Sequence, residues 1–342
     1  MPCLGHDGLV DFSGGCKRSC DVDPYALAQC ADLVDWPDSQ RDGFVFTDVN
    51  TVVNSYAVGG LDALSRLANA SGRPPSDGER LGNAAATIRA AMNSRLWGTG
   101  GTNLSFSDGL DTAQPSKPAV NHASFHSASF PLFFGIADST SRQEALLEFL
   151  RNKRMAGSVY AAYALLLGLY KVTSDHGALA LSLLTSCEVN SWCSMLRVGA
   201  SATMEAWTRP QKPNLSWSHP WASAPSSAIV RGLMGIQPTA IGFRAFTVRP
   251  QPGGLAWASV RTPSLSGWIE ARFDASPTNF SLTLSPPANT MAQVCLPLLG
   301  VVGDATLLID GHITHGHLDG DYACVDGVGS GSKARVIQRI VK

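Results

Sequence analysis

The sequence predicts a mainly helical protein that ends in a β domain. Helical periodicity recurs in paired segments up to about residue 238, after which short alternating runs follow one another between turn signals. The helices are joined by loops of unequal length, and the long loops carry the aromatic, acidic and histidine residues. This arrangement is typical of an α/α toroid, whose helices surround a funnel with a site at one rim. We therefore predict a partial α/α toroid over residues 1–238 and an antiparallel β-sandwich over residues 239–342.

Cap and breaker residues delimit the helices. Thr47 is expected to cap a long helix that ends at a Pro-Pro pair, and Ser76 is expected to cap the next helix with Glu79 as its capping-box partner. A short helical start is also expected near Tyr25 to Cys30. Gly235 is expected to stop the last helix. The remaining helical segments are predicted at 139–154, 158–170, 181–185, 192–196 and 222–234.

The C-terminal part alternates apolar and polar residues over short runs. Pro-Gly, Ser-Pro and Asp-Gly turn signals separate these runs, which is typical of an antiparallel sandwich. The predicted strands are 243–249, 257–261, 267–273, 280–284, 291–297 and 305–309.

Composition excludes several classes of protein. Of the 342 residues 44% are hydrophobic and only 15% are charged, so most of the chain is expected to fold around a core. A net charge of −1 gives no electrostatic basis for binding nucleic acid or an anionic membrane. We expect no membrane span, because no window approaches eighteen apolar residues. The N-terminus lacks the apolar core of a signal peptide, and the compartment stays open.

The cysteines and histidines do not predict a metal site or a cofactor. Cys16 and Cys20 have a loose metal-ligand spacing, but no second Cys or His pair follows at zinc-finger distance. Free buried thiols and disulfides are both open for the remaining cysteines, and the candidate pairs are Cys187 with Cys193 and Cys295 with Cys324. His122 and His126 are four residues apart without an acidic partner, and His312, His315 and His317 form a similar cluster.

The stretch from Gly199 to Pro238 holds the strongest candidate site. Glu205 lies in sequence beside Trp207, and a loop with further rings follows, namely Trp217, His219 and Trp221. A carboxylate among aromatic rings can position a water molecule, and flat indoles suit the apolar faces of sugars. The alternative interpretation is a Trp-rich core with one capping glutamate.

A second candidate loop runs from Leu33 to Phe44. It contains Asp35, Trp36, Arg41 and Asp42 within eight positions. The alternative is a solvated surface loop, but loops on helical scaffolds often carry binding residues.

Two short motifs of these stretches resemble the bacterial and fungal α-L-rhamnosidases of the six-hairpin glycosidase type (glycoside hydrolase family 78). They read Thr203-Met204-Glu205-Ala206-Trp207, one residue tighter than the commonest spacing, and Trp217-Ser218-His219. The resemblance implies that Glu205 is the general base and that the Trp-x-His element touches the sugar. It also implies that Asp35 and Trp36 line the sugar pocket, that Arg41-Asp42-Gly43 marks one branch, and that a rhamnose-containing glycoside is the substrate.

The chain also departs from this family. The family carries an acid-bearing motif rich in Arg, Asp and Glu, which is not found here, and about six or seven helical segments fall short of the twelve of a complete barrel. Inversion requires two carboxylates on opposite faces of the scissile bond. The resemblance therefore implies a C-terminal portion whose partner is the missing N-terminal half. Two alternatives stay open: another α/α-barrel glycosidase of the glucoamylase or trehalase kind, and a catalytically dead carbohydrate-binding remnant.

Overall fold

The computed structural model describes residues 4–5, 7–13, 34–114, 116–276, 279–299, 305–331 and 335–341. The chain divides into two compact units, and each is described by itself. The first consists of Met1–Gly168 and Cys187–Ala222, and the second of Leu169–Ser186 and Ser223–Lys342. The expected helical start at 25–30 and the Cys16–Cys20 pair lie outside the described residues.

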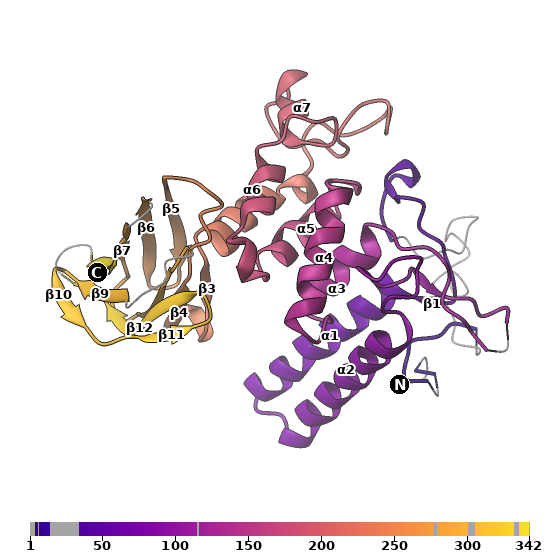
Figure 1. The fold of residues 1–342 in the computed structure, drawn as a ribbon, viewed down its shortest axis with the longest axis horizontal. Helices are drawn as coiled ribbons and strands as arrows, with labels where there is room; N and C mark the ends of the chain where they lie inside the picture. Colours follow the sequence, from indigo (N-terminus) through magenta and orange to yellow (C-terminus); the bar gives the residue numbers. More distant parts are fainter. Residues whose placement is uncertain are drawn as a thin grey trace. The chain divides into compact units, whose positions relative to one another are not determined.

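The first unit is built on two long helices. α1 (Thr51–Ala70) and α2 (Pro75–Arg95) lie side by side, as Figure 1 shows. Two expected caps are wrong. Asn50 caps α1, because its Oδ1 accepts the Val52 and Val53 amides at 2.8 and 3.2 Å, whereas the Thr47 hydroxyl bonds the Val49 carbonyl. Ser76 was expected to cap α2 but lies inside the helix. α2 starts with Pro75 at its first position, where a missing N–H costs nothing, and has no side-chain cap.

Shorter helices complete the helical part. Ser139 caps α4 by accepting the Arg142 amide at 3.3 Å, which confirms the predicted start of this helix. A two-stranded ladder, β1 (Val49–Asn50) with β2 (Gly109–Leu110), joins the start of α1 to the long loop after α2. The remaining helices of the first unit are α3 (His126–Phe133), α4 (Thr140–Lys153), α5 (Ala162–Leu169), which ends at the unit boundary, and α7 (Trp192–Arg197).

The second unit begins with helical turns and continues as a sandwich. It contains α6 (Ala178–Leu184) and α8 (Ala224–Ser227), and α8 runs on as a π-helical segment to Leu233. Gly235 then ends the helix as predicted. Its φ of 64° is left-handed, and a Cβ there would lie 2.0 Å from the Arg249 carbonyl oxygen.

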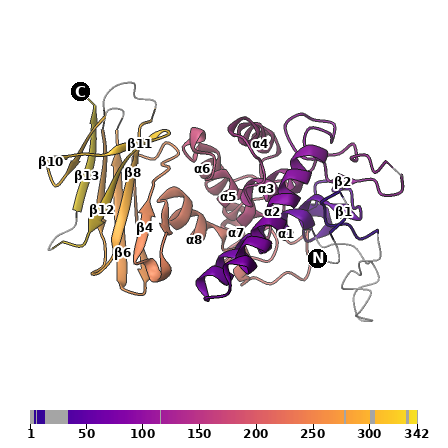
Figure 2. The ribbon, with the colours of Figure 1, turned by 90° about the horizontal axis from the view of Figure 1, so that it is seen from below.

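Two sheets face each other in this unit (Figure 2). The six-stranded sheet has the order β10-β9-β13-β7-β6-β5, and the five-stranded sheet has the order β11-β12-β8-β4-β3. The first sheet consists of β5 (Trp257–Ser264), β6 (Gly267–Ala275), β7 (Asn279–Ser285), β9 (Ala305–Ile309), β10 (His312–Thr314) and β13 (Arg335–Val341). The second consists of β3 (Ile236–Pro238), β4 (Ala245–Val248), β8 (Met291–Pro297), β11 (His317–Asp319) and β12 (Tyr322–Gly329).

The predicted sandwich is confirmed, with one exception to its antiparallel pairing. Apolar residues of both sheets form one core, among them Phe246 and Val294 from the smaller sheet and Phe273 and Leu282 from the larger one. β4 pairs with β8 in parallel, so the sandwich is not antiparallel throughout. A disulfide between Cys295 and Cys324 joins β8 to β12, and a second joins Cys187 to Cys193. Within the described segments, no helix is long and apolar enough to span a membrane.

Candidate functional site

Glu205 lies in an irregular segment whose main chain is hydrogen-bonded to the loop downstream of it. Its amide donates to the Ser216 carbonyl at 2.9 Å, and the Ser216 amide donates back to Glu205 Oε2 at 2.8 Å. Two residues before Glu205, the Thr203 carbonyl accepts the His219 amide at 2.7 Å, and the Thr203 hydroxyl donates to the His219 carbonyl at 2.8 Å. Two main-chain bonds and two side-chain bonds therefore join the segments that carry the two family-like motifs. These bonds fix the position of the carboxylate relative to the imidazole.

The surroundings of Glu205 favour its ionised form. The Ser216 N–H, the ammonium group of Lys212 at 3.3 Å and the nearby His219 together hold the pKa of Glu205 below its usual range. The side chain is 17% exposed, so the carboxylate remains within reach of a ligand or a water molecule. A charged, hydrogen-bonded and partly accessible carboxylate has the properties of a general base at neutral pH.

Three rings gather beside this carboxylate. The Tyr160 ring packs edge-to-face on His219 and Trp221, with centroids 5.7 and 5.1 Å apart, and its hydroxyl lies 3.4 Å from His219 Nε2. Burial, and then the negative charge of Glu205, raise the pKa of Tyr160, so the phenol keeps its proton. Trp221 is largely exposed and Trp217 is about half exposed. Tyr160 was missed from the sequence, because only the fold brings residue 160 to this loop.

Asp35 is buried and serves as an anchor. Its Oδ2 accepts the Ser158 amide at 2.8 Å and lies 2.7 Å from His126 Nε2, while its Oδ1 accepts the Ser158 hydroxyl and the Trp36 amide. The side chain is 1% exposed, so its oxygens are occupied by protein donors and do not face a ligand. Asp35 instead ties its loop to Ser158, whose hydroxyl accepts the Tyr160 amide at 3.0 Å. This placement assigns Asp35 a supporting role in place of the expected sugar contact.

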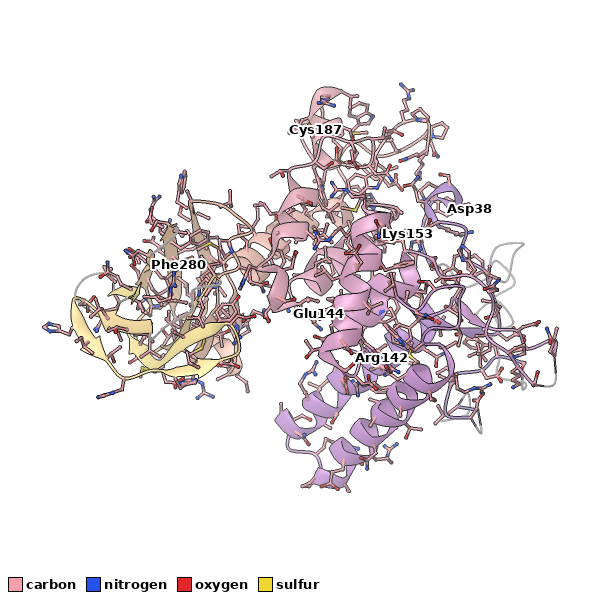
Figure 3. All side chains as sticks on the ribbon, viewed as in Figure 1. Asp38, Arg142, Glu144, Lys153, Cys187 and Phe280 are labelled. Atoms are coloured by element: carbon pink, nitrogen blue, oxygen red, sulfur yellow. A yellow bond between two sulfur atoms is a disulfide. The ribbon has the colours of Figure 1, made fainter. Side chains whose placement is uncertain are left out.

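Arg41 and Asp42 also hold the loop in place. Arg41 donates through Nε to the Asp35 carbonyl at 3.0 Å and pairs with Asp38 at 2.8 Å. Asp42 accepts the Phe125 amide at 2.6 Å and lies 2.8 Å from the ammonium group of Lys153, at the end of α4 (Figure 3). Trp36 differs from these residues because it is 39% exposed and is available for an external contact.

Trp207 is the other predicted sugar contact that the structure buries. It is 1% exposed, donates from Nε1 to the Gly157 carbonyl at 2.9 Å, and packs edge-to-face on Trp192. The indole therefore fixes the main chain behind Glu205 and has no face left for a ligand.

The loop between Glu205 and Ser216 is held from a second side. The Gln211 amide group donates to Asn190 Oδ1 at 2.9 Å, and Asn190 donates to Gln40 at 2.8 Å and to the Met155 carbonyl at 2.9 Å. Asn190 lies inside the short loop that the Cys187–Cys193 disulfide closes. Lys212 follows Gln211 directly, so this network also positions the cation beside Glu205.

Three histidines outside the ring cluster lie beside carboxylates, namely His122, His126 and His317. His122 Nδ1 lies 2.5 Å from buried Asp108, whose oxygens also accept the Val45 and Ser124 amides at 2.9 Å. His317 lies 3.6 Å from Asp326 on the β domain. In the part of the chain that is described, no group of three or more His, Cys, Asp or Glu side chains is placed to hold a metal ion.

Comparisons with known proteins agree with the motifs. A family model described as the bacterial alpha-L-rhamnosidase 6 hairpin glycosidase domain matches residues 17–232, and one described as the bacterial alpha-L-rhamnosidase C-terminal domain matches residues 235–303. An alpha-L-rhamnosidase of Streptomyces avermitilis is 30% identical over 132 residues, which cover 36% of this chain and 13% of that protein.

Solved structures share the fold. The alpha-L-rhamnosidase of Dictyoglumus thermophilum superposes with a TM-score of 0.67 at 17% identity, covering 84% of this chain and 31% of its own. The structure of the Streptomyces avermitilis alpha-L-rhamnosidase complexed with L-rhamnose has a TM-score of 0.64 at 21% identity. The match covers 90% of this chain and 29% of that enzyme. The chain thus spans less than a third of the length of these relatives. Because the first family model matches well over half of the chain, the protein belongs to the bacterial alpha-L-rhamnosidase six-hairpin glycosidase family.

Proposed function

We propose that this chain supplies the general-base side of an inverting α-L-rhamnosidase site. The observation that carries the proposal is the placement of an ionised Glu205 beside His219 on two segments joined by main-chain bonds, with the Tyr160 ring packed against His219. Glu205 takes the proton of a water molecule while that water attacks the anomeric carbon. The water enters on the face opposite the leaving group, so the configuration inverts.

The rings and the exposed indoles are proposed to hold the rhamnosyl group. His219 and Tyr160 offer hydrogen bonds to sugar hydroxyls, and Trp36, Trp217 and Trp221 offer flat apolar faces. Asp35 and Trp207 act behind them as anchors of the two loops.

The second carboxylate is proposed to come from a segment outside this chain. Inverting glycosidases place their two carboxyl groups about 6.5–9.5 Å apart. Exposed apolar side chains on one face of α1 support the proposal of an absent neighbour. These are Tyr56, Leu64 and Leu67, which are 56%, 51% and 61% exposed. Leu64 and Leu67 follow Tyr56 by eight and eleven positions, a spacing that places them on the same side of the helix.

Hydrolysis of chromogenic glycosides by the complete enzyme tests this function. We expect turnover of an α-L-rhamnoside and none of an α-D-glucoside, whereas the reverse would favour a glucoamylase-like or trehalase-like enzyme. The isolated 342-residue chain is expected to bind rhamnose weakly without turnover. Rhamnose binding without hydrolysis by the complete enzyme would indicate a carbohydrate-binding remnant. Robust hydrolysis by the isolated chain would contradict the proposal that the second carboxylate comes from outside this chain.

A further inference from the structure

The outer face of the larger sheet carries two exposed tryptophans. In β5 and β6 the residues that face away from the core alternate with core residues, and Trp257 and Trp268 occupy outward positions in which they are 55% and 50% exposed. In the strand register, Trp257 is opposite Asp274 and Trp268 is opposite Pro263. These two positions are six steps apart along β5, so the two tryptophans are anchored ~20 Å apart on the sheet at about 3.3 Å per residue.

Each indole is oriented by an arginine. The Arg261 guanidinium lies 4.2 Å from the ring centroid of Trp268, and the Arg272 guanidinium lies 4.7 Å from that of Trp257. A cation on one face of a ring fixes the plane of the indole and leaves the exposed part of the ring for an external contact. The two rings are therefore held as fixed platforms.

A groove lies in the same rows of the sheet. It has a volume of about 410 Å³. Its polar lining consists of the two arginines, Glu270, and the hydroxyl-bearing residues Ser259, Thr283 and Ser285. Such a lining offers planar donors, one carboxylate acceptor and hydroxyl groups of both kinds. A ligand rich in hydroxyl groups matches this set of partners.

The charges that line the groove and the charge of Asp274 beside it cancel one another. Arg261 pairs with Glu270 at 3.0 Å, and Arg272 makes two bonds to Asp274 at 2.9 and 2.6 Å. Two cations and two anions leave no net charge that would select an anionic or a cationic partner. An uncharged ligand is therefore favoured over a polyanion or an acidic peptide.

We propose that this face of β5, β6 and β7 binds a neutral oligosaccharide chain, with Trp257 and Trp268 stacking on sugar rings at its two ends. The proposal concerns a binding surface in the second unit and does not depend on Glu205 or on hydrolysis. Indoles that are half exposed and fixed by cations, together with a charge-neutral row of donors and acceptors, fit a sugar polymer in particular.

Affinity electrophoresis of the whole chain in gels that contain a neutral rhamnan, a neutral β-glucan or polygalacturonate tests the proposal. We expect at least one neutral polymer to retard the protein and polygalacturonate to have no effect. The double variant Trp257→Ala/Trp268→Ala should weaken the apparent affinity about tenfold or more. Ile313→Ala, an exposed residue on β10 at the opposite edge of the same sheet, serves as the matched control and should bind as the wild type does.

The other outcomes overturn the proposal. These are retardation by polygalacturonate alone, no retardation by either neutral polymer, and unchanged binding by the double variant. Sedimentation of the same proteins tests whether the face is instead an interface between two copies. If the wild type is a dimer and the double variant is not, this face is an interface between two copies and the proposed sugar surface is wrong. If the double variant melts below the wild type, the single variants Trp257→Ala and Trp268→Ala decide between these results.

Discussion

Glu205 and Ser216 are bonded twice, once through the Glu205 amide and once through the Glu205 carboxylate. The second bond uses Oε2 as the acceptor of a main-chain N–H, and the ammonium group of Lys212 lies 3.3 Å from the same oxygen. The same residue thus closes the loop and carries the proposed chemistry. Because the donor is a main-chain group, side-chain substitutions at Ser216 leave this bond in place.

The acidic limb of the pH–rate profile of the complete enzyme reports on Glu205. The base must be ionised, and its pKa lies below the usual range, so activity should persist into acid until Glu205 is protonated. Lys212→Met removes a cation 3.3 Å away, which raises the pKa and moves the acidic limb of kcat/KM to higher pH. Arg209→Met, an exposed cation in the same loop, should leave the profile unchanged. An unshifted limb in Lys212→Met would argue against Glu205 as the titrating base.

Tyr160 and His219 should act as a coupled pair in sugar binding. Tyr160→Phe removes a hydroxyl that lies 3.4 Å from His219 Nε2, and His219→Ala removes the imidazole, so each should raise KM with little change in kcat. The double variant should lose less than the sum of the two effects, with a coupling energy of about 0.5–1.5 kcal/mol. Steady-state kinetics on the complete enzyme and its three variants measures this energy, and strictly additive losses would show that the two groups act independently.

Asp35→Asn should destabilise the first unit. The amide that replaces one oxygen cannot accept a hydrogen bond, so buried donors around Ser158 or His126 lose their partner. We expect a loss of about 3 kcal/mol or more in the free energy of unfolding. Asp38 (Figure 3) is an exposed carboxylate of the same loop that pairs with Arg41, and Asp38→Asn should cost about 1 kcal/mol at most. Urea unfolding followed by fluorescence compares the two, and equal losses would contradict the anchoring role.

The exposed face of α1 should make the isolated chain associate. Apolar side chains at Leu64 and Leu67 are more than half exposed, and such patches favour contact with a second molecule. Leu64→Ser/Leu67→Ser should shift the sedimentation profile toward monomer. The control is Val198→Ser, an exposed apolar residue of the loop after α7, which should leave the profile unaltered. A wild-type chain that sediments as a monomer at all concentrations would contradict the proposal that the exposed face of α1 is normally covered by a neighbouring segment.

The sequence predicted the elements whose pattern is local. Ser139 and Gly235 mark helix ends through short-range chemistry, and the alternation in β5 to β8 follows directly from one buried and one solvated face. The later strands β10 to β13 were not predicted, because glycine and polar residues interrupt the alternation after Ile309. The predicted cap at Thr47 lies three residues too early, because Thr and Asn both make good caps and only the ladder with β2 decides where α1 begins.

The candidate site was predictable only as far as its motifs reach. Glu205 and His219 belong to motifs of fixed spacing, and their main-chain pairing brings them together. Tyr160 carries no motif, and its role follows from packing between distant segments. The burial of Asp35 and Trp207 also depends on tertiary contacts, with Ser158 and Gly157, which no local pattern contains.

Chemical rescue of Glu205→Ala in the complete enzyme tests the proposed general base most directly. Removing the carboxylate should lower kcat about 10²–10⁴-fold, while Glu144→Ala, an exposed glutamate on α4 (Figure 3), should retain wild-type turnover. Azide needs no base and fits the space that the side chain leaves, so it should restore turnover and give a rhamnosyl azide of inverted configuration. Wild-type turnover in Glu205→Ala, or lost turnover that azide does not restore, would contradict the assignment of Glu205 as the base.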